Sequence, residues 1–253
     1  MAAKKNPSKA SDAEQTGGDG AATRRKPTKA VSQEATKAAE AEPAGEDTII
    51  LPIGHYVGAY FPGPDEPLQH HTVRVGQTPV RLRSDDEFGI WALAHGFSGE
   101  DAVRPWTRQH IVAVAREAGL DNAPEIVADL LAEDVLAEVT MNTQDSVEFA
   151  MAYRPAPLMF GVGVTREEPV AVGIGLQGQP AVETSSYGFE LWRFGHRAGS
   201  LWEFGRIQGE LLRDEAGMSE TETAPEQMLL HTFWELQALL ASNVVYLDLA
   251  GNE

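Results

Sequence analysis

Apolar residues open the patterned part of the chain at Ile49 and continue, with few polar interruptions, to Phe61. Two shorter runs follow, over 71–75 and 79–83, and their side chains alternate between two faces as half-buried strands do. Pro62-Gly63 and Gly76-Gln77 separate the runs and are typical of turns. The pattern therefore predicts three short strands.

Helical periodicity replaces the alternation after Ser84, which forms a predicted capping box with Glu87. Three helices are expected: one from Ser84 to about His95, one over 108–118 and one that starts after Asn122. A closing strand is expected over 135–139. Residues 140–153 are expected to return as a second strand of a hairpin, and the Pro-rich segment 154–157 to end the unit.

The same pattern then recurs with an offset of 101 residues. The matched positions are Pro79, Ser84, Phe88, Trp91 and His95, which correspond to Pro180, Ser185, Phe189, Trp192 and His196. Strands are expected over 158–164, 170–176, 180–184 and 244–249, and helices over 187–196, 200–217 and 224–241. The repeat predicts an α+β fold of tandem duplicated winged-helix-like domains, each with three short strands, three helices and a closing strand.

Composition adds a tail to this organisation. Residues 1–46 contain no aromatic residue and cannot bury enough apolar surface to order themselves, so a disordered tail is expected before units at 47–153 and 154–253. The tail holds eight of the 20 Lys+Arg and seven of the 38 Asp+Glu, which leaves a formal net charge near −19 on the rest. Such an acidic surface disfavours nucleic acid as a partner.

Several classes of protein are disfavoured by what the sequence lacks. It has no Cys, no apolar run of signal-peptide length near its start and no stretch of ~18 apolar residues, so we expect a cytoplasmic protein without a membrane partner. It also has no P-loop, HExxH or serine-elbow motif. The glycines of 173–178 precede extended chain rather than a helix, which argues against a dinucleotide site. No catalytic residue, metal ligand or cofactor is predicted.

Histidine and arginine supply the candidates for two alternative functions. His95 and His196 each follow a Trp by four residues and are expected to be structural. An enzyme with an unrecognised site would need His55, His71 and His95 to converge in one pocket. A DNA-binding transcription regulator would need five arginines on one face, namely Arg74, Arg81, Arg83, Arg104 and Arg108.

Three features resemble the PqqD-like elements that hold leader peptides during ribosomal peptide maturation: the strand order, a first helix that ends in Gly96 and a third helix that ends in a Leu-Leu turn. The positions that carry the resemblance are Leu82, Ile90, Gly96, Val127, Leu130, Leu131 and Leu136, with Leu191, Leu236, Leu239 and Val245 in the second unit. The resemblance implies that an extended peptide adds to the third strand, in a groove beside the third helix.

The residues that would contact such a peptide are Val80, Arg81, Leu82, Arg83, Ile126 and Leu130 in the first unit and Ala181, Val182, Glu183, Thr184, Met228 and Phe233 in the second. The sequence thus predicts a non-enzymatic, acidic adaptor that binds a protein or peptide partner. The DNA-binding regulator and the enzyme stay open as alternatives.

Overall fold

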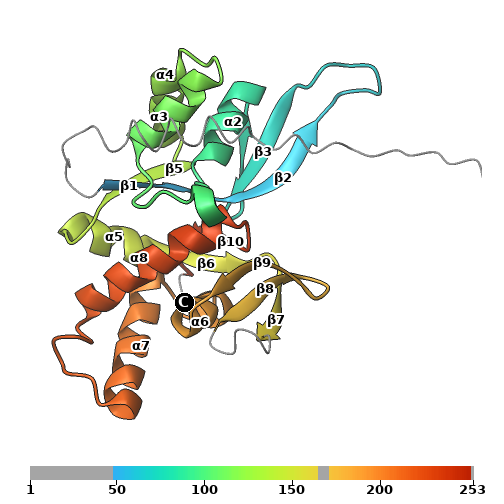
Figure 1. Cartoon of the computed structure of the whole chain (residues 1–253). Coiled ribbons are helices and arrows are strands. Elements are labelled where there is room, and N and C mark those ends of the chain that lie inside the picture. The colour runs from blue at the N-terminus through green and yellow to red at the C-terminus, as the bar shows by residue number, and fades with distance from the viewer. Residues whose placement is uncertain (1–47, 165–170, 252–253) are drawn as a thin grey trace, which may run out of the picture.

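The computed structural model describes residues 48–164 and 171–251, so the tail predicted over 1–46 lies outside the described residues. Within these ranges the chain forms seven α-helices, one short 3-10 helix and ten strands in four small antiparallel sheets (Figure 1). The predicted α+β class is confirmed. No helix in the described ranges combines the length and apolar content that a membrane crossing requires.

The elements of the first half are β1 (Thr48–Pro52), β2 (His55–Tyr60), β3 (His70–Val75), β4 (Thr78–Leu82), α2 (Asp85–Leu93), η1 (Gly99–Asp101), α3 (Arg108–Glu117), α4 (Ala123–Ala132) and β5 (Leu136–Thr140). The helix α5 (Gln144–Ala152) follows. The elements of the second half are β6 (Tyr153–Pro157), β7 (Phe160–Val164), β8 (Val172–Leu176), β9 (Gln179–Thr184), α6 (Ser186–Phe194), α7 (Leu201–Ala216), α8 (Pro225–Ala241) and β10 (Val245–Leu249).

Strand pairing has the same order in both halves. A three-stranded sheet β2-β3-β4 corresponds to β7-β8-β9, and a two-stranded sheet β1-β5 corresponds to β6-β10. Side chains of Ser84, Thr107, Ser185 and Ser200 cap the following helices. At Ser84 the expected reciprocal bond is displaced, since the Glu87 carboxylate accepts from the N–H of Arg83 at 2.6 Å.

The expected opening strand over 49–61 is divided in two at Gly54, so each half opens with four strands rather than three. Gly54 has φ +92°, and a Cβ atom there would lie 2.7 Å from the carbonyl oxygen of Arg74. Glycine alone fits this turn. It directs β1 away from the three-stranded sheet and toward β5, against which Ile49 lies opposite Val139.

The segment between the halves was predicted incorrectly. Residues 140–153 form helix α5 rather than a returning strand, and the helix buries Ser146, Phe149 and Ala150 on one face. The segment 154–157 is not a loop but most of β6, in which Pro155 lies opposite Leu247 of β10. Proline is tolerated there because β6 is an edge strand.

Strand β1 contributes to two apolar cores. Ile50 packs with Trp91, Ile111 and other residues of the first half. Ile49, Leu51 and Ile53 belong instead to the core built around α8 in the second half. Figure 1 shows β1 between the two halves, with α8 crossing below it, and the Gly54 N–H donates to the Leu247 carbonyl at 2.8 Å.

Candidate functional site

The first predicted peptide site lies at the open edge of the sheet β2-β3-β4. Along β4 the exposed side chain of Arg81 stands between half-buried Val80 and buried Leu82, and exposed Arg83 follows the strand. The Arg83 guanidinium donates to the Glu133 carboxylate at 3.0 Å, which ties the end of the strand to the end of α4. Two arginines thus face solvent on this edge.

The backbone of this edge is partly blocked. A two-residue turn joins Val75 to Thr78, so hydrogen-bonded and non-hydrogen-bonded pairs alternate along β3 and β4 from that point. The backbone polar groups of Pro79, Arg81 and Arg83 therefore point toward the open edge. Pro79 has no N–H to donate, and the Arg83 N–H already donates to Glu87 at 2.6 Å. Among these outward positions, only Arg81 keeps an N–H for a further strand.

The second predicted site, on β9, is more irregular. Ala181 has no partner across the pair with β8, since Gly175 lies opposite Pro180 and Ile174 opposite Val182. This bulge and Pro180 are both features that protect an edge strand from pairing. Glu183 is exposed, and the hydroxyl of Thr184 donates to Glu235 of α8 at 3.1 Å.

The helix residues predicted to line the peptide grooves are core residues. Ile126 and Leu130 are 7% and 1% exposed, and Met228 and Phe233 are 2% and 1% exposed. Ile126 and Leu130 lie in the same apolar core cluster as Leu82. A peptide on the edge of β4 would therefore meet the strand itself and not these side chains.

The three histidines of the enzyme alternative have different neighbours. The ring of His55 lies 4.9 Å from that of Tyr246. His71 is buried, donates from Nε2 to Asp85 at 2.9 Å and bonds to the Tyr56 hydroxyl through Nδ1 at 3.0 Å. His95 bonds through Nδ1 to main-chain carbonyls of α2. No group of three or more His, Asp or Glu in the described ranges is arranged to hold a metal ion.

The arginines of the DNA-binding alternative contact other groups of the chain. Arg74 donates to the Gly76 carbonyl, and Arg108 makes a two-point contact with the Glu138 carboxylate. Arg104 donates to the Trp234 carbonyl of α8 at 3.4 Å. Of the five arginines, Arg81 is the one for which the described residues show no hydrogen bond or ion pair. The DNA-binding alternative stays a hypothesis.

Burial lowers the pKa of His95 to about 4, although its two carbonyl contacts favour the charged form. Because the unfolded chain takes up a proton near pH 6.5 and the folded chain does not, this group makes the free energy of unfolding fall as the pH drops from about 6.5 to about 4. The slope is at most about 1.4 kcal/mol per pH unit.

We expect His95→Gln to flatten this part of the stability profile. Urea unfolding at several pH values between 4 and 7 would measure it, with His231→Gln on the exposed side of α8 as the control. If the two variants gave parallel profiles, His95 would not be the group that titrates.

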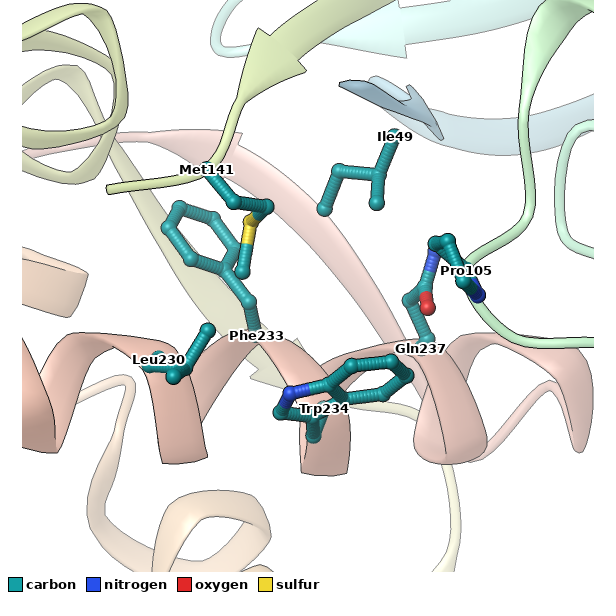
Figure 2. Close-up of a pocket in the computed structure, with 7 residues that line it drawn as sticks. All are labelled: Ile49, Pro105, Met141, Leu230, Phe233, Trp234 and Gln237. Carbon is teal, nitrogen blue, oxygen red and sulfur yellow. The ribbon is translucent and has the colours of Figure 1, made fainter. Parts of the chain in front are cut away.

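An apolar pocket that no sequence motif predicts lies where the two halves meet (Figure 2). Its lining comes from β1, from two loops and from one face of α8: Ile49, Pro105, Met141, Leu230, Phe233, Trp234 and Gln237. The enclosed space is about 30 Å³, and the volume with the open mouth included is about 290 Å³. The pocket thus depends on packing between residues that are almost 190 positions apart in the sequence.

Gln237 is the polar residue of this pocket that stands out. Its side chain is 6% exposed, and its Nε2 atom has no hydrogen-bond partner in the described part of the chain. Gln237 also lines a neighbouring depression of about 260 Å³, together with His95, Arg104 and Trp106. The one sequence signal is a glutamine among the core residues Leu236, Leu239 and Leu240.

Comparison of the chain with known proteins adds no identification: no protein-family model, curated protein or solved structure matches it.

Proposed function

We propose that this protein is a non-enzymatic adaptor built from two winged-helix-like halves, and that it binds an extended segment of a protein partner along the edge of β4. One observation carries the proposal: β4 ends its sheet with the Arg81 N–H directed outward and with no further strand beside it among the described residues. An added strand would hydrogen-bond to this residue, as in strand augmentation.

The geometry supports a short contact. Pro79 and the Glu87-bound Arg83 flank Arg81, so the matching segment pairs over about three residues of β4. The exposed guanidinium group of Arg81 favours acidic residues in that segment, whereas that of Arg83 is already paired with Glu133, and the chain as a whole carries a net charge of −18. The partner we propose is therefore an acidic, extended protein segment bound weakly and reversibly.

The edge of β9 is a poorer place for such a segment. Its bulge at Ala181 interrupts the regular spacing of backbone groups. Glu183, which pairs with Gly173 of β8, has the position on β9 that Arg81, which pairs with Thr72 of β3, has on β4. An acidic segment would meet a carboxylate there. We assign the partner to β4 alone.

The test uses the full chain as bait in a lysate of its native host, with and without nuclease treatment, and bound proteins are quantified by mass spectrometry. Arg81→Pro removes the outward N–H and the charge without removing a bond to β3, and we expect it to reduce the recovered partner by about tenfold. Arg81→Glu should weaken recovery through charge alone. Arg116→Glu, which makes the same charge change on the exposed side of α3, is the matched control.

A partner recovered equally by the wild type and by Arg81→Pro would contradict the proposal. Recovery of nuclease-sensitive material only would also contradict it and would favour the DNA-binding alternative. Hydrogen exchange gives a second readout: a bound segment should slow exchange of the Arg81 amide more than that of any other residue of β4.

A further inference from the structure

Three arginines of the second half have no ion pair with any acidic residue in the described ranges: Arg154 of β6, Arg193 of α6 and Arg197, which follows α6. By contrast, Arg206 of α7 contacts two glutamates. The chain as a whole carries a net charge of −18. Unpaired guanidinium groups in such a chain make a local positive charge that an anion can offset.

Two of these guanidinium groups lie on one aromatic ring. The Cζ atoms of Arg193 and Arg197 are 4.6 Å and 5.6 Å from the centroid of the Phe194 ring. Both arginine side chains are exposed, whereas Phe194 is half-buried. Stacking on the ring holds the two planar groups near each other at the end of α6 and leaves their N–H groups open to solvent.

Arg154 joins this pair from β6. A Cβ atom on Gly251 would lie 3.0 Å from Nη1 of Arg154, and the Gly251 N–H donates to the Gly199 carbonyl at 3.3 Å. Gly199 is two residues beyond Arg197. The imidazole of His196 lies close to both arginines, because burial, Arg197 and Arg154 together lower its pKa. The three arginines and His196 therefore form one basic cluster.

The first half has no such cluster at the matching positions. By the offset of 101 residues and by the pairing of β1 and β6, the arginines correspond to Ile49, Ala92 and Gly96. His95 bonds through Nδ1 to main-chain carbonyls, whereas Nδ1 of the matching His196 is buried and has no partner in the part of the chain described. The shared fold thus does not require these charges.

Neighbouring carboxylates do not pair with the cluster. Asp248 lies opposite Arg154 across β6 and β10, but it accepts from two main-chain N–H groups at 2.6 Å and 3.0 Å. Glu190 of α6 makes no ion pair with a described residue, and Glu203 of α7 pairs with Arg206. Since each guanidinium group has five N–H donors, the cluster keeps donors for an anion from outside the chain.

We propose that Arg154, Arg193 and Arg197 bind a phosphate group, either inorganic phosphate or a phosphate monoester. Guanidinium groups donate in pairs to phosphate oxygens, and a phosphate monoester carries close to two negative charges at pH 7. A carboxylate has one charge and fewer acceptor oxygens. Helix α7 begins at Leu201, two residues after Gly199, and its N-terminus adds partial positive charge. The site is separate from the edge of β4 and does not depend on the adaptor proposal.

The test titrates the full chain at pH 7 with inorganic phosphate, methyl phosphate and acetate, at one ionic strength set with sodium chloride. The histidine ring signals in ¹H–¹³C NMR spectra report binding, and His196→Gln identifies the His196 signal among the seven histidines. We expect both phosphates to shift this signal in a saturable way and acetate to bind about tenfold more weakly. Tighter binding of methyl phosphate would assign the site to phosphate monoesters, and tighter binding of inorganic phosphate to the free ion.

Arg154→Gln, Arg193→Gln and Arg197→Gln should each weaken phosphate binding by about tenfold. Arg116→Gln on the exposed side of α3 removes the same charge away from the cluster and should leave the affinity unchanged. No saturable shift of the His196 signal would overturn the proposal, as would equal losses in Arg116→Gln and Arg197→Gln. Acetate that binds as tightly as phosphate would also overturn it and would indicate a site for an acidic protein segment.

Discussion

Replacing Trp91 by alanine is expected to lower the free energy of unfolding by about 3–5 kcal/mol. Trp91 is 5% exposed and packs in the core of the first half, and its Nε1 donates to the Ile53 carbonyl at 3.2 Å. Alanine would leave a large cavity and an unpaired carbonyl at the end of β1. Urea unfolding followed by far-UV circular dichroism would measure the loss.

Trp192, at the matching position of α6, gives the control. It is half-buried, and its Nε1 is buried without a hydrogen-bond partner in the described ranges. Trp192→Phe should therefore cost less than about 0.5 kcal/mol or stabilise the protein, whereas Trp91→Phe should cost about 1–3 kcal/mol because Ile53 loses its donor. Equal costs for the two phenylalanine variants would show that the Trp91 hydrogen bond contributes nothing.

Expressed alone, residues 154–253 are expected not to fold, whereas residues 47–153 should keep a cooperative unfolding transition. Seven of the 20 buried residues in the core around α8 precede residue 154: Ile49, Leu51, Ile53, Val139, Met141, Phe149 and Ala150. Burial of a large apolar side chain contributes about 1.5–3 kcal/mol to the free energy of unfolding. Losing these seven contributions together would remove about as much free energy as stabilises a whole domain. All 16 buried residues of the other core lie within 47–153.

Thermal unfolding and the dispersion of the amide proton spectrum would distinguish the two fragments, with residues 47–253 as the control that keeps both cores. A folded fragment 154–253 would show that its core closes without β1 and α5. Such a result would support the predicted boundary between 153 and 154, which the shared packing does not follow.

Local chemistry made much of the fold predictable. The cap at Ser84 and the turns at glycine are short-range signals, and the recurrence of Pro79 and Trp91 at Pro180 and Trp192 indicated a second set of elements. Helix α5 was missed because nine residues with three buried positions fit a strand or a helix about equally well. The division at Gly54 was missed because its cause is the Arg74 carbonyl, 20 residues away.

The candidate sites were less predictable than the fold. The residues predicted for the strand side of a peptide site do lie on or directly after β4 and β9. Burial of Ile126, Leu130, Met228 and Phe233 depends on how the helices pack, which one sequence does not specify. Protection of the β4 edge by Pro79 could have been inferred from the turn before it. The pocket at Gln237 could not, because its walls come from both halves.

The position of β1 between two cores also limits how the gene can change. Alternate side chains of a strand point to opposite sides, so Ile50 enters one core while Ile49 and Leu51 enter the other. Insertion or deletion of one residue in this strand would exchange every side chain between the cores at once. Substitutions can accumulate there one at a time, but a change of length must disrupt both halves together.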